Sequence, residues 1–522
     1  MERETFLQRL GQTCQAWDLA VIGGGATGMG IAVDAAARGY QVALLEQTDF
    51  GKGTSSRSTK LVHGGLRYLQ QGNISLVMEA LKERGLLRRN APHLVRDLPF
   101  LVPNYQWWEA PFYGIGLKVY DLLAGQYGFA RSVVLSPEET LARIPTLQRD
   151  GLRGGVLYHD GQFDDSRLLI SLAQTAVMRG ACLLNYARVE RLLKNETGSL
   201  AGLEFRDQET GRQYSLRARC VVNATGPFCD DLRRLDEPKS EPILAPSQGV
   251  HIVLDRSFLP GGTAIMVPHT RDGRVMFAIP WHGHAVVGTT DTPISQTSLE
   301  PQPLQGEIEF ILETAGNYLS RRPGRADILS VFTGIRPLVR ADRSAGTAAL
   351  SREHTITISN SGLLTIAGGK WTTYRKMAED AVDHASVLAG LEERPCVTRN
   401  LRIHGWQKEV AKDGNLAVYG SDAVGLEQLM RQKPEFAEPL HPDLPICGAQ
   451  IAWAVREEMG RTLDDVLARR TRALFLNARA AVAMAPAAAQ IMASELGRDQ
   501  SWQDRQLKEF NQIAACFIVS TA

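Results

Sequence analysis

The sequence predicts an α/β fold in three parts: a nucleotide-binding α/β domain, a domain around a mostly antiparallel sheet, and a helical C-terminal domain. Residues 17–45 are typical of a strand, a glycine-rich turn, a helix and a second strand. Between about 245 and 335, short apolar runs alternate with Gly and Pro turns, which indicates antiparallel strands. From about 395 onward glycine becomes rarer and helical patterns dominate, notably over 451–476.

The length of 522 residues exceeds what one hydrophobic core usually supports, so several domains are expected. Helices are expected near 73–91 and 166–179, and Asp164 with Asp165 predicts an N-cap for the second of them. The stretch 100–129 gives no clear assignment. The expected limits are 1–92, 151–245 and 336–390 for the nucleotide-binding domain, 93–150 and 246–335 for the antiparallel domain, and 391–522 for the helical domain.

The charge balance indicates no binding of nucleic acid, because 58 basic and 57 acidic residues nearly cancel. Seven scattered cysteines without a C-x-x-C pair indicate neither a metal site nor a disulfide framework, which fits a reducing compartment. Residues 1–15 do not resemble a signal peptide, and the apolar stretch 480–493 is too short to span a bilayer. We therefore expect a cytoplasmic chain that does not cross a membrane.

The turn Gly23-Gly24-Gly25-Ala26-Thr27-Gly28 fits the pattern G-x-G-x-x-G between a strand and a helix. Its glycines permit a tight turn, a close approach of backbone amides to a pyrophosphate, and close helix–strand packing. The second strand ends at Glu46, eighteen residues after Gly28, where a carboxylate can accept hydrogen bonds from ribose hydroxyls. A carboxylate there disfavours a 2′-phosphate, so the residues predict FAD or NAD rather than NADP.

A loop of small residues follows within ten positions of Glu46, beginning at Gly53. Such a loop can lie against the pyrophosphate, ribityl chain and ring of a flavin. It can equally be an ordinary flexible loop, and the residues alone leave both interpretations open.

Six motifs, the glycine turn included, occur in one order along the chain, at residues 22–28, 54–69, 223–227, 288–291, 334–338 and 368–375. With these motifs the chain resembles the FAD-dependent glycerol-3-phosphate dehydrogenases, within the D-amino-acid-oxidase-like flavoproteins. The segments HGGLRYL at 63–69 and GGKWTTYR at 368–375 are the most specific, and residues 455–472 resemble the helical C-terminal domain of the same enzymes.

This resemblance implies a Rossmann-like FAD-binding domain of the glutathione-reductase and D-amino-acid-oxidase type, under an antiparallel substrate domain. It implies oxidation of sn-glycerol 3-phosphate to dihydroxyacetone phosphate by hydride transfer to non-covalent FAD, with the electrons passed to a quinone. The alternatives are an oxidase that uses oxygen, a flavin amine or amino-acid oxidase, and a non-catalytic flavoprotein. Retention of three candidate phosphate-binding cations disfavours the last.

The substrate's phosphate requires fixed cations, preferably an arginine that binds two oxygens. Arg336 is the first candidate, with a buried structural arginine as the alternative. The proton acceptor expected from the resemblance is His251, although a lone histidine in a strand is often structural. The other substrate-binding candidates taken from the resemblance are Arg67, Tyr68, Lys370 and Thr290, and Asp291 is expected to help shape the pocket.

The cofactor-binding candidates come from the glycine turn, the small-residue loop and the motifs that the resemblance identifies. They are Gly23, Gly25, Thr27, Gly28, Glu46, Gln47, Thr54, Ser55, Ser58, His63, Gly64, Gly65, Leu66, Val189, Ala224, Thr225, Gly226, Gly334, Gly369, Lys370, Trp371 and Thr372.

The segment 107–118 concentrates aromatic and aliphatic side chains, with basic residues at Lys118 and Arg131. Indole and phenol rings favour the membrane interface, and a quinone is dissolved in lipid. We therefore hypothesise peripheral attachment to the inner face of the cytoplasmic membrane. The alternatives are packing of these rings inside the protein, a subunit contact in a homodimer, or attachment through the arginines of 469–472.

Overall fold

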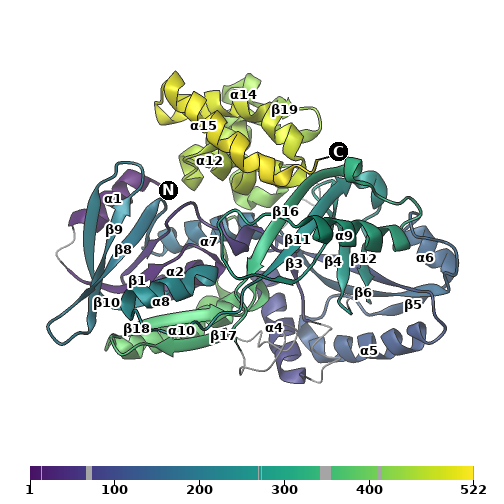
Figure 1. Cartoon of the computed structure of the whole chain (residues 1–522), viewed down its shortest axis with the longest axis horizontal. Helices are drawn as coiled ribbons and strands as arrows, with labels where there is room; N and C mark the ends of the chain where they lie inside the picture. Colours follow the sequence, from purple (N-terminus) through teal and green to yellow (C-terminus); the bar gives the residue numbers. More distant parts are fainter. Residues whose placement is uncertain are drawn as a thin grey trace.

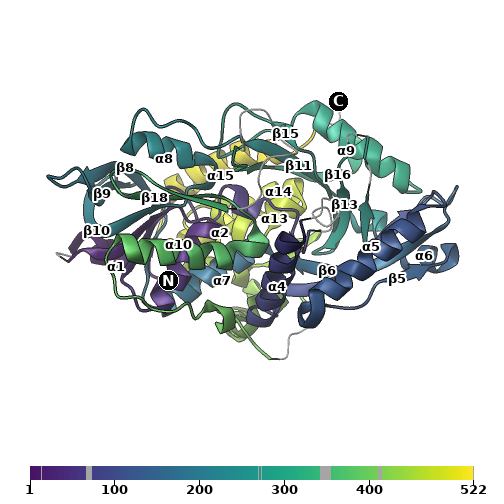
Figure 2. The same ribbon diagram turned by 90° about the horizontal axis from the view of Figure 1, so that it is seen from below.

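The computed structural model describes residues 1–12, 15–65, 73–268, 270–271, 273–340, 354–408 and 414–520. Figure 1 shows two sheets beside each other, with the C-terminal helices above the boundary between them. Figure 2, from below, shows that helices α4 (Ile74–Asn90) and α5 (Glu109–Ala124) lie on the opposite side of the molecule from those C-terminal helices.

The first sheet has the strand order β17-β18-β10-β1-β2-β7, and the pairs from β18 to β7 are parallel. The hairpin β8–β9 extends it through β10. Helix α2 packs against α7 and α10, so the central strands are covered, as their continuous apolar runs require. The bounds are β1 (Trp17–Ile22), α2 (Ala26–Ala37), β2 (Val42–Leu45), α7 (Asp165–Met178), β7 (Cys182–Leu184), β8 (Ala187–Lys194), β9 (Leu200–Asp207), β10 (Gln213–Asn223), β17 (His354–Ile358), β18 (Leu363–Gly368) and α10 (Tyr374–Leu388).

The strand–turn–helix–strand unit predicted over 17–45 is confirmed. The predicted cap of the helix near 166–179 is also confirmed, because the Asp164 carboxylate accepts a hydrogen bond from the Arg167 amide. Helix α4 agrees with the helix expected near 73–91, and it begins after Asn73, whose side chain caps it.

The second sheet has the order β15-β11-β14-β13-β12-β4-β6-β3, with β16 paired to β11 and β5 to β6. All its pairs are antiparallel except β12 with β4, so the antiparallel sheet predicted for 245–335 is confirmed. The bounds are β3 (Leu61–Val62), β4 (Val95–Asn104), β5 (Val133–Leu135), β6 (Gly154–Phe163), β11 (Ser247–Asp255), β12 (Ala264–Val267), β13 (Met276–Trp281), β14 (His284–Gly288), β15 (Thr292–Pro293) and β16 (Ile328–Arg336).

Two details of this sheet differ from the sequence-based expectations. The unassigned stretch 100–129 contains the end of β4 and the whole of α5. Strand β6 pairs with β4 in the second sheet, although the expected limits assign residues from 151 onward to the nucleotide-binding domain. We therefore group 151–163 with the antiparallel domain, and the remaining limits stay a proposal. In the described residues, the other α-helices before the C-terminal region are α1 (Arg3–Gln12), α6 (Pro137–Arg143), α8 (Cys229–Asp236) and α9 (Gln305–Tyr318).

The C-terminal domain is helical and carries one small hairpin. Its predicted helical run over 451–476 is interrupted, because Met459 and Arg472 adopt left-handed backbone conformations, with φ of 53° and 70°. A π-helical turn lies between these two residues. The bounds are α11 (Ala423–Gln432), β19 (Pro439–His441), β20 (Leu444–Cys447), α12 (Gly448–Glu458), the π-helix (Asp465–Arg470), α13 (Ala473–Leu476), α14 (Ala478–Leu496) and α15 (Gln500–Ala514).

Buried ion pairs join the C-terminal domain to the first domain, and we call this region the junction. Both carboxylate oxygens of Asp49 accept hydrogen bonds from the Arg470 guanidinium, at 2.6 and 2.8 Å. Arg167 binds Glu458 through two hydrogen bonds, at 2.8 and 2.7 Å. The guanidiniums of Arg469, Arg470 and Arg472 are all buried and paired. Their proposed role as a membrane contact is therefore wrong.

Candidate active site

The glycine turn between β1 and α2 leaves no room for a side chain at Gly23 or Gly28. Gly23 has a φ of 110°, and a Cβ atom built on it would lie 2.6 Å from the Ala224 carbonyl oxygen. A Cβ on Gly28 would overlap the carbonyl oxygen of Gly23 itself. Helix α2 begins after Gly25, and the Ala26 amide donates to Ser55 Oγ at 2.9 Å. The turn thus places the N-terminus of α2, with Thr27 in its first turn, beside closely packed backbone, an arrangement that suits a pyrophosphate.

Glu46 lies at the end of β2 beside this turn. Its Oε2 accepts a hydrogen bond from the Gly24 amide at 2.7 Å, and its Oε1 accepts from the Thr48 amide at 2.9 Å. Burial raises the pKa of Glu46, and the backbone donors oppose that effect. The carboxylate therefore lies at the edge of the glycine turn, and its contact with a ribose stays a prediction. Gln47 follows it, and Val189 lies on β8, two residues after Ala187, whose amide donates to the Glu46 carbonyl.

The other cofactor motifs converge on the same region from four segments of the chain. Thr54 Oγ1 donates to the Ile335 carbonyl at 2.6 Å, and the Trp371 indole donates to the Ser55 carbonyl at 2.9 Å. The amide of His63 donates to Thr372 Oγ1 at 3.3 Å. The segment 224–226 follows β10 against the glycine turn, as the Ala224 amide donates to the Ile22 carbonyl.

Two adjoining cavities lie between the sheets at this point. The Lys370 cavity, of about 240 Å³, is lined by residues of the cofactor motifs, among them Thr54, Ser58, His63, Gly334, Gly369, Lys370, Trp371 and Thr372. The Arg274 cavity, of about 200 Å³, is lined by residues of the second sheet and its turns, among them Tyr158, Asp160, Arg274, Thr290 and Asp291. Five residues line both: Thr59, Leu61, His63, Phe277 and Arg336.

Arg336 ends β16 where the cavities meet. Its guanidinium donates to the Thr290 carbonyl at 2.9 Å and lies 3.3 Å from the Asp291 carboxylate. The Arg274 guanidinium lies 3.9 Å from the same carboxylate. Asp291 thus holds two cations at the wall of the Arg274 cavity. Thr290 is buried, and its hydroxyl donates to Glu307 at 3.0 Å, which fixes the turn that carries Asp291.

His251 lies on β11 and lines the Lys370 cavity. Its Nε2 is 2.9 Å from Thr59 Oγ1, and its ring stacks on Phe332 at 4.8 Å between centroids. Burial lowers the pKa of His251 well below its usual value, and the nearby Lys60 and Arg336 charges add to this effect. The imidazole is therefore neutral at pH 7, and the same surroundings make it a weak base. His63 also reaches both cavities, whereas His251 lines only one.

The structure does not describe every predicted residue. Leu66, Arg67 and Tyr68 lie outside the described residues. Ser58 lines the Lys370 cavity, and its hydroxyl donates to the Asp165 carboxylate at 2.6 Å. Sequence reasoning missed Arg274 and Thr59. Arg274 lies outside all the motifs, whereas Thr59 lies within the motif at 54–69 but was not singled out as a site residue.

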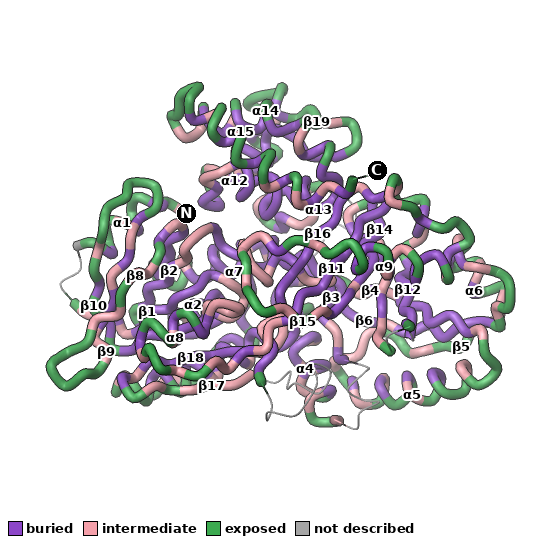
Figure 3. The backbone as a smooth tube through the Cα atoms, in the orientation of Figure 1, coloured by how far each residue is buried: buried purple, intermediate pink, exposed green. Residues whose placement is uncertain are grey.

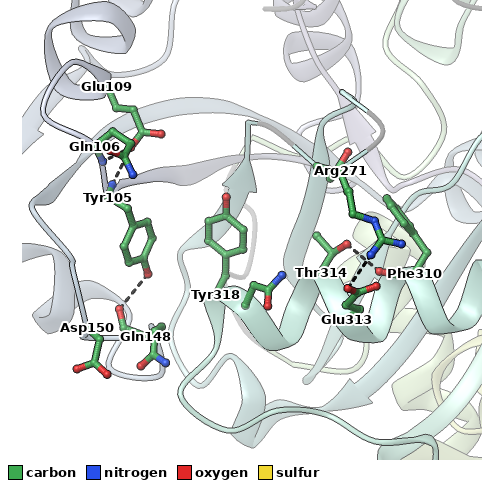
Figure 4. A pocket seen from close by; sticks show the side chains of 12 residues that line it. Tyr105, Gln106, Glu109, Gln148, Asp150, Arg271, Phe310, Glu313, Thr314 and Tyr318 are labelled. Carbon is green, nitrogen blue, oxygen red and sulfur yellow. Dashed lines mark hydrogen bonds and ion pairs between the residues drawn. The ribbon is translucent and has the colours of Figure 1, made fainter.

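Another cavity, of about 380 Å³, lies apart from this site at the outer edge of the second sheet and shares no lining residue with the two cavities (Figure 4). Tyr105 and Tyr318 meet edge to face there, at 5.8 Å between ring centroids. Tyr105 Oη donates to the Gln148 carbonyl at 2.9 Å. Three acidic residues line this cavity, Glu109, Asp150 and Glu313, and Glu313 pairs with the exposed Arg271.

Comparisons with known proteins agree with the geometry of the glycine turn. A family model described as "FAD dependent oxidoreductase" matches residues 18–375, and one described as "C-terminal domain of alpha-glycerophosphate oxidase" matches 361–503. The chain is 41% identical over 552 residues to the mitochondrial glycerol-3-phosphate dehydrogenase of Rattus norvegicus, covering 99% of this chain and 75% of that protein. The Arabidopsis thaliana enzyme is 41% identical over 542 residues, covering 96% of this chain and 86% of that protein.

Solved structures extend this likeness to the fold. The glycerol-3-phosphate dehydrogenase from Bacillus halodurans complexed with FAD superposes with a TM-score of 0.81 at 31% identity, covering 100% of this chain and 98% of that chain. An L-alpha-glycerophosphate oxidase from Mycoplasma pneumoniae shares the fold at a TM-score of 0.57 and 17% identity, covering 73% of this chain and 96% of that chain. The predicted fold class, enzyme class and cofactor are confirmed. The chain belongs to the glycerol-3-phosphate dehydrogenase family of FAD-dependent oxidoreductases.

Proposed function

We propose that this protein oxidises sn-glycerol 3-phosphate to dihydroxyacetone phosphate and passes the electrons to a quinone. The observation that supports this most strongly is the 41% identity to dedicated glycerol-3-phosphate dehydrogenases over nearly the whole chain. Arg336 adds a physical reason, because it places a fixed guanidinium where the two cavities meet. Bound FAD supplies the hydride acceptor.

The protein must hold a phosphate dianion, align the substrate's C2 and accept the proton of its hydroxyl. We assign the phosphate to Arg336, with Lys370 and Arg67 as further cations. We assign the proton to His251, which is neutral at pH 7 because of its burial. His63 is the competing acceptor, since it lines both cavities directly.

Steady-state assays of the purified holoprotein test the reaction and the acceptor. We expect turnover of glycerol 3-phosphate with a water-soluble quinone, and slow or no production of hydrogen peroxide in air. Rapid peroxide formation would make the protein an oxidase. Turnover of glycine or proline without turnover of glycerol 3-phosphate would make it an amino-acid oxidase.

Replacement of Arg336 tests the phosphate site. Loss of one charge-assisted contact to a dianion is expected to cost about 2–4 kcal/mol, or roughly thirty- to thousand-fold in kcat/KM, while the bound flavin spectrum stays intact. Lys370→Ala should change kcat/KM in the same direction. Normal turnover by Arg336→Ala would place the phosphate elsewhere.

We further propose that α5 attaches the protein to the surface of a membrane. Trp108, Phe112, Ile115, Val119 and Leu122 are all exposed and recur every three or four residues, so they form one stripe along the helix. Figure 3 shows this alternation of exposed and buried residues along α5. Exposed Lys118 and Arg131 flank the stripe and suit an anionic lipid surface. No helix in the described part of the chain is both long and apolar enough to cross a bilayer.

Cell fractionation and a double substitution test this attachment. We expect activity in the membrane fraction at low salt, and a shift to the soluble fraction on replacement of Trp107 and Trp108 by Ser. Soluble wild-type activity would exclude the attachment. Soluble dimers that dissociate on the same double substitution would identify the stripe as a subunit contact.

A further inference from the structure

Helix α5 has two faces with different neighbours. Its outer face carries the exposed apolar stripe, whereas Tyr113, Leu117, Tyr120 and Ala124 on its inner face are buried. One of these inner residues, Tyr120, contacts the turn that carries His63 and Gly65 of the active site. The Gly64 amide, in the turn between His63 and Gly65, donates a hydrogen bond to Tyr120 Oη at 2.9 Å.

The Tyr120 hydroxyl is itself held in place. It donates to Asp160 Oδ2 at 2.8 Å, and Asp160 Oδ1 accepts from the Arg84 guanidinium at 2.7 Å. Burial raises the pKa of Tyr120 well above its usual value, and the Asp160 carboxylate adds to this effect, so the hydroxyl stays a donor. Arg84 lies 4.3 Å from the centre of the Phe129 ring. Such buried, charge-assisted bonds hold their geometry tightly.

The His63–Gly65 turn packs directly against Tyr120. A Cβ atom built on Gly64 would overlap Tyr120 Oη and would lie 2.8 Å from Leu81 Cγ. A glycine at this position is therefore required by the close approach of the tyrosine. His63 lines both cavities, and Gly65 and Asp160 line the Arg274 cavity. A displacement of α5 would therefore move residues that line the two cavities.

We infer that Tyr120 is a positioning residue that couples α5 to the His63–Gly65 turn, so that docking of α5 on lipid improves the alignment of the active site. The inference rests on the membrane attachment proposed above. A misplacement of about 1 Å far from the reacting atoms can cost about a hundredfold in rate, so a small restraint on α5 has a measurable effect.

The test compares Tyr120→Phe with Tyr113→Phe in the holoprotein. Tyr113 is a suitable control because it lies on the same buried face, two helical turns earlier, and loses the same single hydroxyl. Vesicles of phosphatidylcholine and phosphatidylglycerol serve as the lipid surface. The fraction of protein that floats with the vesicles is measured first. The visible circular dichroism of the bound flavin, and kcat and KM for glycerol 3-phosphate with a water-soluble acceptor, are then measured with and without vesicles.

We expect vesicles to change the flavin dichroism and to raise kcat in the wild type and in Tyr113→Phe. Tyr120→Phe should float equally and keep its FAD, but show neither response and a kcat lower by about tenfold, with KM changed by less than about twofold. Asp160→Asn weakens the same series of hydrogen bonds by removing the charge that Tyr120 and Arg84 contact. This variant should also lose the response to vesicles, so it provides a second test if Tyr120→Phe folds poorly.

The outcomes separate the two proposals. Failure of the wild-type protein to float overturns the membrane attachment and the coupling with it. Normal flotation, with Tyr120→Phe and Tyr113→Phe responding alike, overturns the coupling alone. Normal flotation without any change in dichroism or kcat in the wild type also overturns the coupling.

Discussion

The cofactor cradle is partly buried and the junction is fully buried, and the two are built from different chemical groups. The cradle, which comprises Gly23–Gly28 and Glu46, is mostly backbone in close approach with one carboxylate. The junction is built from side-chain charges, with Asp49 between Arg469 and Arg470, and Glu458 against Arg167. The cradle should therefore be sensitive to added volume, and the junction to the loss or gain of a charge.

The largest expected effect comes from removing one charge at the junction. Burial opposes ionisation of Asp49, but Arg470 and Arg469 outweigh it and lower the pKa of Asp49. Asp49→Asn removes the negative charge that faces the buried Arg469 and Arg470, and it replaces one of the two accepting oxygens by an amide group that cannot accept a hydrogen bond. We expect a loss of about 3–5 kcal/mol in unfolding free energy, measured by chemical denaturation of the holoprotein.

A matched control and a rescue sharpen this prediction. Glu313 pairs with Arg271 on the surface, so Glu313→Gln should change the unfolding free energy by less than about 1 kcal/mol. The double variant Asp49→Leu with Arg470→Met should recover most of the stability, because it leaves no unpaired charge. Equal effects of Asp49→Asn and Glu313→Gln would show that the junction charges do not stabilise the fold.

The junction should also respond to acid through His93, which lies close to Gly405 and Gly420 of the C-terminal region. Burial lowers the pKa of His93 to about 4, and the charge of Arg167 adds to this effect. The unfolded chain, with a histidine pKa of about 6.5, binds more protons than the folded protein between these values. Stability should thus fall as the pH falls from 6.5 to 4, by up to about 3 kcal/mol.

Thermal unfolding of His93→Gln across this range checks the assignment. The variant should be less stable than the wild type at pH 7 but should lose less stability on acidification. A pH dependence identical to that of the wild type would show that His93 does not carry the acid response.

The cradle should respond to a single methyl group. Gly28→Ala introduces a Cβ that overlaps the Gly23 carbonyl oxygen, and such overpacking costs about 1–3 kcal/mol. FAD affinity should fall by roughly ten- to a hundredfold, measured by quenching of FAD fluorescence on addition of the apoprotein. Gly306→Ala is the control, since a Cβ at this position of α9 meets nothing within 4 Å. Unchanged affinity in Gly28→Ala would contradict the role of the turn.

The same contrast explains what could be predicted from the sequence. The cradle follows a local pattern of strand, turn, helix and acidic residue within 17–46, so it could be predicted from the sequence. Asp49 and Arg470 are 421 positions apart, and no local periodicity links them. Similarly, the Gly64–Tyr120 contact joins a recognised motif to a stretch that the sequence left unassigned.

The amino-acid composition of α5 explains why the sequence did not predict this helix. Pro111, Gly114 and Gly116 each lower helix propensity, yet Pro111 lies in the first turn, where its missing amide hydrogen is not needed. The stripe from Trp108 to Leu122 has helical spacing, but an exposed apolar face gives no core periodicity to support a helix. The family motifs identified the candidate binding residues. Arg274 and Asp160 lie outside these motifs, and the pairing of strands in the second sheet brings them to the Arg274 cavity.

The proposed reaction is tested most directly by anaerobic mixing of the purified holoprotein with stoichiometric glycerol 3-phosphate, followed by measurement of the flavin's blue absorbance band. We expect the band to bleach in a single turnover, with one dihydroxyacetone phosphate formed per flavin, and bleaching to be strongly slowed in Arg336→Ala. A flavin that stays oxidised with glycerol 3-phosphate, or that bleaches instead with glycine or proline, would contradict the proposed reaction.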